Sequence, residues 1–170
     1  MRLPERFQAD FSRIKAAIEP LTKRAYFVGG ATRDWLLKRD FNDIDIEIYD
    51  ISPDRFDEVM KAIGAIGVGK SYFVYKLGAF DLSLPRSEQK TGRGHKAFGV
   101  AWENDPLKAC RRRDFTINAI MIDIFSGERL DFYGGGRDLE AKMIRHIDDR
   151  AFAEDSLRVL RAARFAARLG

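Results

Sequence analysis

The alternation of acids and isoleucines over residues 43–48 constrains the fold more than any other feature of the chain. The segment runs Asp-Ile-Asp-Ile-Glu-Ile, and side chains two positions apart on a β-strand point to the same face. Ile44, Ile46 and Ile48 therefore predict a buried face, and the acids predict the opposite face. We expect a strand from Asp43 to Tyr49 that packs one side on a hydrophobic core.

The remaining patterns predict the mixture of helices and strands that is typical of an α+β fold, in one domain of ordinary size. Short apolar runs predict strands at 25–28, 72–77 and 79–84, with the last two joined as a hairpin at Gly78. Helical spacing and helix-start signals predict helices at about 5–18, 31–38, 53–63, 138–143 and 155–169. We expect a helix that passes into a strand over 115–125, a flexible segment over 64–69, and a polar loop over 85–99.

Charge and cysteine content exclude several classes of protein. The chain has 30 lysines and arginines against 26 acids, a net charge of +4, which by itself argues only weakly for a nucleic-acid partner. The single cysteine, Cys110, rules out an intrachain disulfide and suits a reducing compartment, so we expect a cytoplasmic protein. No apolar stretch is long enough to span a membrane, and the N-terminus has no apolar signal core.

Asp43 and Asp45 form a candidate metal site. On a strand their carboxylates lie on the same side, about 6.5 Å apart along the strand axis. Mg²⁺ prefers oxygen ligands, and two such carboxylates can hold one or two ions for nucleotidyl transfer. An isolated Asp-x-Asp pair is more often a solvated strand face, so the prediction needs support from other motifs.

Gly29-Gly30 adds support because it lies between a predicted strand and a predicted helix. Glycines let a backbone approach a phosphate closely, and a helix start offers unbonded N–H groups. Arg33 would then point towards a triphosphate. A tight turn followed by a surface arginine explains the same residues equally well. Asp81, on the later hairpin strand, is either a third catalytic carboxylate or an exposed strand residue.

The basic run at 111–113 leads into an apolar helix start. Such a run is usually a solvated face or a general phosphate contact, but the apolar sequence that follows indicates that part of it is held in place. Asp114, directly after it, can order an arginine or meet a ribose hydroxyl. Arginines here and carboxylates near residue 43 together suit a metal-bound polyphosphate.

The last predicted helix carries arginines in an apolar background. Arg158, Arg161 and Arg164 recur every three residues, so the helix has no purely charged face and some of these arginines must be partly buried and paired. Glu154 and Asp155 lie within about one turn of Arg158, and a carboxylate beside a guanidinium offers acceptors and donors to the edge of a nucleobase. A structural cluster of salt bridges is the alternative.

Together these motifs resemble those of one family, the class II tRNA nucleotidyltransferases (CCA-adding enzymes) with the related bacterial poly(A) polymerases. The resemblance extends from Tyr26 to Gly170, with the motifs in the family's order. They are residues 28–34 (VGGATRD), 43–45 (DID), 112–119 (RRDFTINA), 131–139 (DFYGGGRDL) and 154–166 (EDSLRVLRAARFA). The resemblance implies a polymerase-β-like nucleotidyltransferase head, in which helices flank a small mixed sheet.

The resemblance also implies roles for single residues. Asp43 and Asp45 match the metal-binding pair, and Gly30 with Arg33 matches positions that contact the triphosphate. The other implied contacts are ribose recognition by Arg113 and Asp114, base-edge recognition by Glu154, Asp155 and Arg158, and further nucleotide contacts by Arg161 and Arg164. The glycines near Gly134 resemble a hinge. Thr32 and Ser156 stand where the family commonly has valine and proline, and both residues suit a helix start.

The implied activity is the addition of C, C and A to the 3′ end of tRNA from CTP and ATP, with two Mg²⁺ ions and no nucleic-acid template. A poly(A) polymerase that adds AMP to RNA 3′ ends is one alternative, and a nucleotide-binding fragment that is inactive alone is another. Residues 86–96 resemble a flexible loop associated with the switch from CTP to ATP, which favours CCA addition over CC addition.

For domain organisation, we expect residues 1–150 to form the head and residues 151–170 to begin a helical neck. The rest of the neck, and the body and tail helices that grip tRNA in this family, would then be absent from the chain. Nothing in the sequence indicates an oligomeric state.

Overall fold

The computed structural model describes residues 1–68, 74–90 and 98–169, with positions 87–90, 98–101 and 154 described as backbone only. The chain divides into two compact units, and each unit is built from two stretches of sequence. Unit 1 comprises Met1–Pro85 and Met121–Leu130, and unit 2 comprises Arg86–Ile120 and Asp131–Gly170. Each unit contains its own β-sheet.

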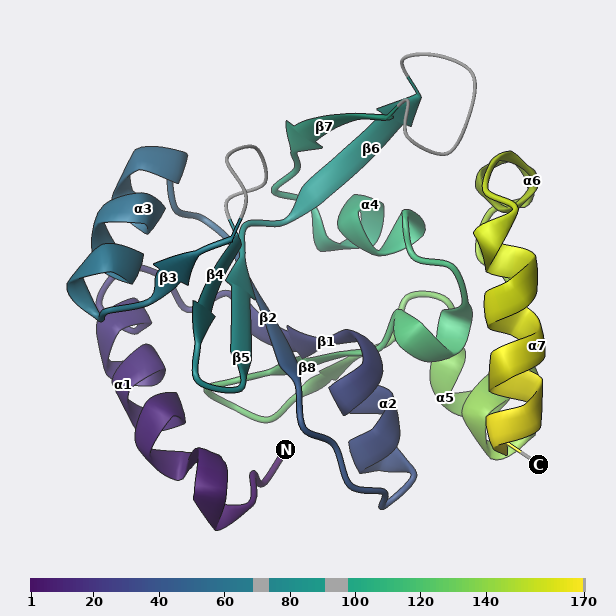
Figure 1. The fold of residues 1–170 in the computed structure, drawn as a ribbon, viewed down its shortest axis with the longest axis horizontal. Coiled ribbons are helices and arrows are strands. Elements are labelled where there is room, and N and C mark those ends of the chain that lie inside the picture. The colour runs from purple at the N-terminus through teal and green to yellow at the C-terminus, as the bar shows by residue number, and fades with distance from the viewer. Residues whose placement is uncertain (69–73, 91–97, 170) are drawn as a thin grey trace. The chain divides into compact units, whose positions relative to one another are not determined.

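Unit 1 contains a mixed sheet of 7 strands in the order β3-β4-β5-β2-β1-β8-β9 (Figure 1). β2 and β5 run parallel, whereas the other neighbouring pairs are antiparallel. The strands are β1 (Ala25–Val28), β2 (Ile44–Ile48), β3 (Ile66–Gly67), β4 (Val74–Leu77), β5 (Phe80–Ser83), β8 (Met121–Asp123) and β9 (Arg129–Leu130). A mixed sheet flanked by helices confirms the predicted α+β class.

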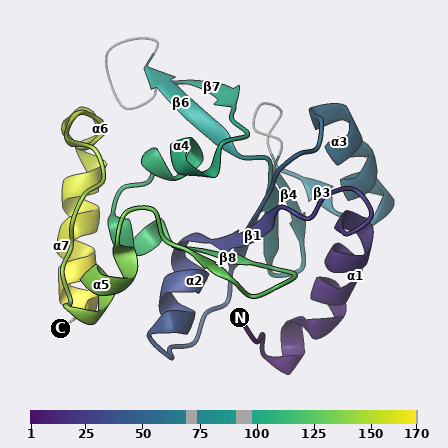
Figure 2. The same ribbon diagram turned by 180° about the vertical axis from the view of Figure 1, so that it is seen from behind.

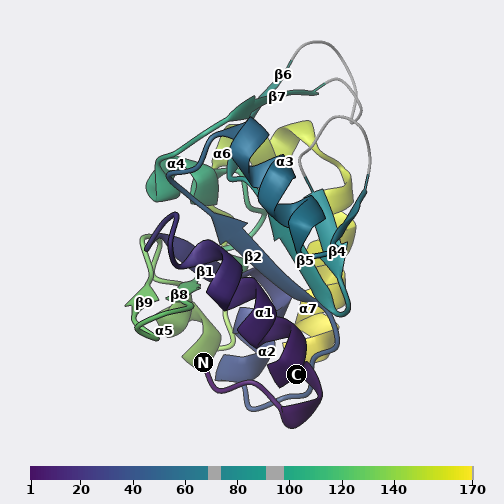
Figure 3. The same cartoon turned by 90° about the vertical axis from the view of Figure 1, so that its left-hand side faces the viewer.

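The core of unit 1 lies between this sheet and two helices, α1 (Gln8–Ile18) and α3 (Pro53–Ala62), which lie against the same face (Figure 3). The short η1 (Glu5–Phe7) precedes α1, and α2 (Gly29–Leu36) follows β1. The three isoleucines of β2 are fully buried in this core with Ile14 and Phe56. Burial of each such side chain is worth roughly 1.5–3 kcal/mol, and a slip of one residue would expose all three.

Unit 2 consists of a two-stranded hairpin, several short helices and one longer helix. Its elements are β6 (Arg86–Lys90), β7 (Phe98–Trp102), α4 (Pro106–Arg111), η2 (Thr116–Asn118), α5 (Gly135–Glu140), α6 (Asp149–Glu154) and α7 (Leu157–Leu169). The β6–β7 hairpin lies beside α4 (Figure 2). Phe115 meets Phe152 and Phe165 edge-on, with ring centroids 6.1 and 5.6 Å away, so aromatic packing joins α6 and α7 to the segment before η2.

Among the described helices of either unit, none has the length and apolar character to cross a membrane.

The start of α5 is packed tightly against η2. A Cβ built on Gly135 would lie 2.1 Å from the carbonyl oxygen of Thr116. The Asp131 carboxylate accepts the N–H groups of Gly135 and Gly136 at 2.8 Å, and Thr116 donates its hydroxyl to Asp138 at 2.6 Å. Glycine is therefore required at position 135 by close packing, and the hinge suggested by the glycine-rich sequence stays a prediction.

Several predicted elements are confirmed. Residues 64–69 and 85–99 were predicted wrongly, and the helices α4 and α6 were not predicted. β1 has its expected bounds, and β2, α1 and α3 differ from expectation by a few residues. Residues 85–99 were expected as a loop but contain β6 and the start of β7, because the polar sequence of β6 lacks the alternation of apolar residues that identifies a strand. Residues 64–69 were expected to be flexible but include β3. Residues 72–73 of the predicted hairpin and 91–97 of the predicted flexible loop lie outside the described residues.

Replacing Gly135 with alanine is expected to lower the free energy of unfolding by about 2–3 kcal/mol, because the new Cβ overlaps a backbone carbonyl. Urea denaturation followed by circular dichroism measures the change. Gly67→Ala is the control, since its Cβ would meet only the Tyr75 ring, at 3.4 Å, and should cost less than about 1 kcal/mol. An equal loss in both variants would contradict the packing argument.

Candidate functional site

The predicted phosphate and carboxylate residues of unit 1 meet at one end of its sheet. β1 ends at Val28, whose register partner on β2 is Asp45. Because these strands are antiparallel, Gly29 and Gly30, directly after β1, lie at the end of the sheet where β2 begins and where Asp43 precedes it. Two motifs that are separate in the sequence are thus brought together by strand pairing.

Asp81 lies at the same end of the sheet. β5 runs parallel to β2, and its register pairs Asp81 with Asp45. On the other side, Asp81 faces Lys76 of β4, and the Lys76 Nζ lies 3.2 Å from the Asp81 carboxylate. Within the described residues, no three His, Cys, Asp or Glu side chains are grouped as a metal site. Asp81 is thus placed beside Asp45 by the strand register, and its catalytic role stays a prediction.

Asp43 and Asp45 have the chemistry that a hard divalent cation requires. Both side chains are exposed, and both offer carboxylate oxygens, the ligands that Mg²⁺ prefers. Glu47, the third acid of the alternation, differs because it is buried and accepts a hydrogen bond from the Tyr49 hydroxyl at 3.0 Å. The exposed acids of this segment are therefore Asp43 and Asp45, which lie at the beginning of β2 beside Gly29 and Gly30.

The start of α2 differs from the sequence prediction in two respects. The helix begins at Gly29, two residues earlier than predicted, with a φ of 71° that favours glycine. Arg33 was expected to point towards a ligand, but it is only 4% exposed. Its Nε and Nη2 donate to the Asp34 carboxylate at 2.9 to 3.0 Å. Its Nη2 also lies 3.7 Å from a Cβ built on Gly30, so the guanidinium is near the predicted phosphate site while it forms an ion pair within the protein.

Replacing Asp34 with alanine is expected to destabilise the protein by about 3–5 kcal/mol, because it leaves the buried Arg33 guanidinium without this carboxylate. Thermal or urea unfolding measures the loss. Glu58→Ala is the matched control, since it removes the exposed Arg55–Glu58 ion pair on α3 and should cost no more than about 1 kcal/mol. A similarly small loss for Asp34→Ala would show that the buried pair contributes little to stability.

In unit 2, Asp114 is the centre of a hydrogen-bond cluster. It is 8% exposed, its Oδ2 accepts a hydrogen bond from Nε of Arg161 at 2.6 Å, and Nη2 of Arg161 forms an ion pair with the same oxygen at 2.6 Å. Its Oδ1 accepts the N–H of Phe115 at 2.8 Å and Nδ2 of Asn118 at 2.9 Å. The prediction that Asp114 orders an arginine is confirmed, and its contact with a ribose stays a prediction. Asn118, four residues after Asp114 in the sequence, was not predicted as a site residue.

Arg158 is also drawn into the protein. It is 8% exposed and donates Nη2 to the carbonyl of Arg112 at 2.8 Å and Nη1 to the carbonyl of Arg113 at 3.4 Å. Its Nε lies 3.8 Å from the carboxylate of Asp155. The expectation of partly buried, paired arginines in this helix is confirmed. Asp155 and Arg158 are paired as expected, whereas recognition of the edge of a nucleobase by this pair stays a prediction.

Arg164 and Glu154 are the other two residues predicted in this helical region. Arg164 is exposed on α7 and forms no hydrogen bond or ion pair with any residue that the structure describes. Glu154 ends α6, but its side chain lies outside the described residues, and so does any contact of its carboxylate.

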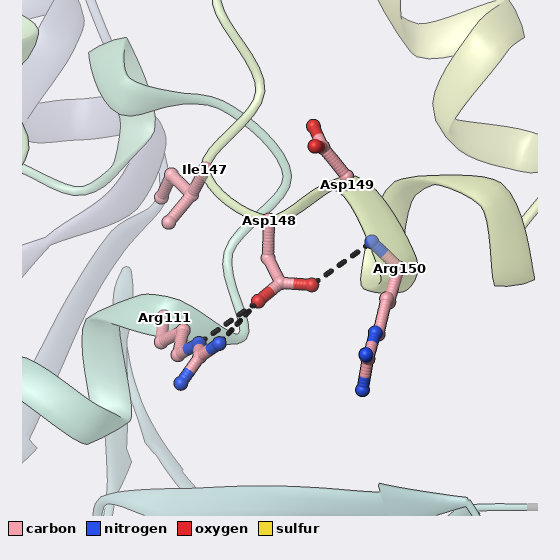
Figure 4. Close-up of a pocket in the computed structure, with 5 residues that line it drawn as sticks. All are labelled: Arg111, Ile147, Asp148, Asp149 and Arg150. Atoms are coloured by element: carbon pink, nitrogen blue, oxygen red, sulfur yellow. Dashed lines mark hydrogen bonds and ion pairs between the residues drawn. The ribbon is translucent and has the colours of Figure 1, made fainter.

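A pocket of about 550 Å³, not predicted from the sequence, lies where α6 begins beside the end of α4 (Figure 4). It is lined by Arg111, Ile147, Asp148, Asp149 and Arg150. Asp148 caps α6 by accepting the N–H groups of Arg150 and Ala151, and its carboxylate lies 2.7 Å from Arg111 Nη2. The Ala151 N–H and the Arg111 guanidinium hold the pKa of Asp148 below its usual value, and Asp148 raises the pKa of Arg111. This ion pair ties the basic run to α6.

Asp148→Asn should reduce stability at neutral pH and have no effect in strong acid. Asparagine keeps the helix cap but removes the ion pair. Because the folded-state pKa of Asp148 is lowered, the contribution is complete above the unfolded-state pKa of about 3.9 and is lost as pH falls through the folded-state pKa. Urea unfolding of both proteins at several pH values measures it. A difference in stability that does not depend on pH would contradict the ion-pair account.

The fold and these motifs define a nucleotidyltransferase head. Residues 25–145 match the family described as the poly A polymerase head domain, and the chain belongs to that family. The multifunctional CCA protein of Stenotrophomonas maltophilia is 43% identical over 153 residues, which cover 85% of this chain and 36% of that protein. The corresponding protein of Xanthomonas oryzae pv. oryzae is 44% identical over 152 residues, covering 86% of this chain and 35% of that protein.

Solved structures agree with this assignment. The Bacillus stearothermophilus CCA-adding enzyme in complex with CTP matches 96% of this chain with a TM-score of 0.74 and 31% identity. The Thermotoga maritima CCA-adding enzyme complexed with tRNA matches 96% of it with a TM-score of 0.73 and 27% identity. The match covers 39% and 38% of those two chains. The chain thus spans about a third of the length of the curated relatives it matches, and less than half of these structures.

Proposed function

We propose that the chain is the catalytic head of an enzyme that adds C, C and A to the 3′ end of tRNA, from CTP and ATP and without a nucleic-acid template. The observation that carries the proposal is the meeting of Gly29, Gly30, Asp43 and Asp45 at one end of the sheet in a member of this family. The matched enzymes are described with CTP and with tRNA, which supports the same classes of substrate here.

In this proposal the exposed carboxylates of Asp43 and Asp45 hold two Mg²⁺ ions, and Asp81 is a third catalytic carboxylate beside Asp45. Bound Mg²⁺ would favour deprotonation of the attacking hydroxyl and neutralise charge on the leaving pyrophosphate. Gly29 and Gly30 let the backbone at the start of α2 approach the triphosphate, and Arg33 lies beside them. The 3′-hydroxyl oxygen of the RNA attacks the α-phosphorus, the bond to the β-phosphate oxygen breaks, and pyrophosphate leaves.

The residues of unit 2 are proposed to recognise the nucleoside. The roles are ribose recognition by Arg113 and Asp114, base-edge recognition by Glu154, Asp155 and Arg158, and further contacts by Arg161 and Arg164. The Asp155–Arg158 pair supports the base-edge role, because carboxylate acceptors and guanidinium donors lie side by side. We place the head at residues 1–150 and the start of a helical neck at 151–170. The single cysteine, Cys110, suits a cytoplasmic protein.

Poly(A) addition to RNA 3′ ends is the second candidate, because the matching family is described as the poly A polymerase head domain. The two activities differ in base selection and in the length of the product. A head that binds nucleotides but needs further chain to bind RNA is a third outcome, which the partial coverage of the relatives supports.

Incorporation of labelled CTP and ATP onto tRNA that ends before CCA, with Mg²⁺, tests the proposal. Ordered addition of C, C and A is expected, and Asp45→Ala should reduce its rate by about 10³-fold or more, since several kcal/mol of charge stabilisation are lost. Asp54→Ala, which removes an exposed acid from the first turn of α3, should leave the rate unchanged.

Other outcomes decide between the alternatives. Long A tails without C would indicate a poly(A) polymerase. Nucleotide binding that depends on Mg²⁺, without incorporation, would indicate a head that needs more chain. Absence of nucleotide binding would contradict all three readings of the site.

A further inference from the structure

The two oxygens of the Asp114 carboxylate are held in different ways. Oδ1 is held by Asn118 Nδ2 and by the N–H of Phe115. Asn118 is 5% exposed and lies in η2, four residues further along the chain, so this side of the carboxylate is fixed by buried, local structure. The Oδ1 atom therefore cannot turn towards a ligand without breaking two hydrogen bonds.

Oδ2 faces a more accessible partner. Its hydrogen-bond donor is Nε of Arg161 on α7, whose side chain is 50% exposed and whose Nη2 forms an ion pair with the same oxygen. A guanidinium normally binds a carboxylate with two parallel hydrogen bonds, one to each oxygen. Here Nε and Nη2 of Arg161 both lie 2.6 Å from Oδ2, while Asn118 and Phe115 donate to Oδ1. One of the two positions on Oδ2 can thus be given to another donor while Arg161 stays bound.

We propose that Asn118 is a positioning residue for the sugar of the bound nucleotide, and that Asp114 Oδ2, beside Arg161, is the oxygen that accepts a ribose hydroxyl. The proposal rests on the proposed function, in which Asp114 recognises ribose. Asn118 acts through Asp114 and does not touch the nucleotide. Its contribution is to hold the plane of the carboxylate, because rotation into the parallel two-oxygen pair with Arg161 would turn Oδ2 out of the direction in which it accepts the hydroxyl.

The structure supplies a matched control on the same short helix. Thr116 is also buried and also donates its side-chain hydrogen bond to an aspartate, but that aspartate is Asp138. Thr116→Val therefore removes a buried hydrogen bond from η2 without changing the donors of Asp114. Asn118→Ala removes the donor to Oδ1. Asn118→Asp keeps the shape of the side chain and replaces the donor with an acceptor.

The test compares the dissociation constants of CTP, 2′-deoxy-CTP and 3′-deoxy-CTP with Mg²⁺, by calorimetry on the 170-residue chain, after circular dichroism has verified that each variant is folded. Wild type is expected to bind CTP about tenfold or more tightly than at least one deoxy analogue, since a hydrogen bond to a charged acceptor is lost. Asn118→Ala should reduce that ratio to about two, and Asn118→Asp should reduce it at least as far. Thr116→Val should leave the ratio unchanged.

Each contrary result has its own meaning. If wild type binds no CTP, the proposed function fails, and this inference fails with it. If wild type binds CTP without preference for ribose, or if both Asn118 variants keep the wild-type ratio, the proposed function stands and the positioning role is overturned. An equal loss of the ratio in Thr116→Val would also overturn it, because the effect would then reflect the packing of η2.

Discussion

The burial of Ile44, Ile46 and Ile48 against α1 and α3 is the interaction on which the arrangement of unit 1 depends. It fixes which face of β2 is inside, and so it also fixes where Asp45 emerges. β2 pairs with β1 on one side and β5 on the other. Glycines, carboxylates and a helix start therefore reach one end of the sheet through strand pairing, although they are dispersed along the sequence.

Several charged side chains of unit 2 form hydrogen bonds within the unit itself. Arg158 donates to two consecutive carbonyls more than forty residues earlier in the chain, and Arg161 holds Asp114. Buried guanidinium groups are stable only when their donors are satisfied. The backbone at 112–114 and the helix α7 therefore depend on each other's positions. In the proposed enzyme, residues that select the base and residues that meet the sugar would share one hydrogen-bond network.

Local patterns predicted three elements. β1 is a continuous apolar run, β2 alternates isoleucines with acids, and α3 has a clear helix start. The approach of Gly29 to Asp45 depends on strand order, which no local spacing encodes. The six-residue helices α4 and α6 were missed, although Asp105 and Asp148 cap them and were visible as signals. Sequence also could not show that Arg33 bonds to its neighbour Asp34, since an arginine on a short helix can equally reach outward.

The discontinuity of unit 1 has a consequence for biosynthesis. Residues 121–130 join the sheet only after the first part of unit 2 has been made, and the paired residues of β1 and β8 are about ninety-five positions apart. At roughly 5–20 residues per second, translation leaves that edge of β1 open for about 5–20 seconds. An open strand edge is a template for intermolecular pairing. During this interval the newly made chain is therefore prone to aggregate through β1, at the edge that β8 covers in the folded sheet.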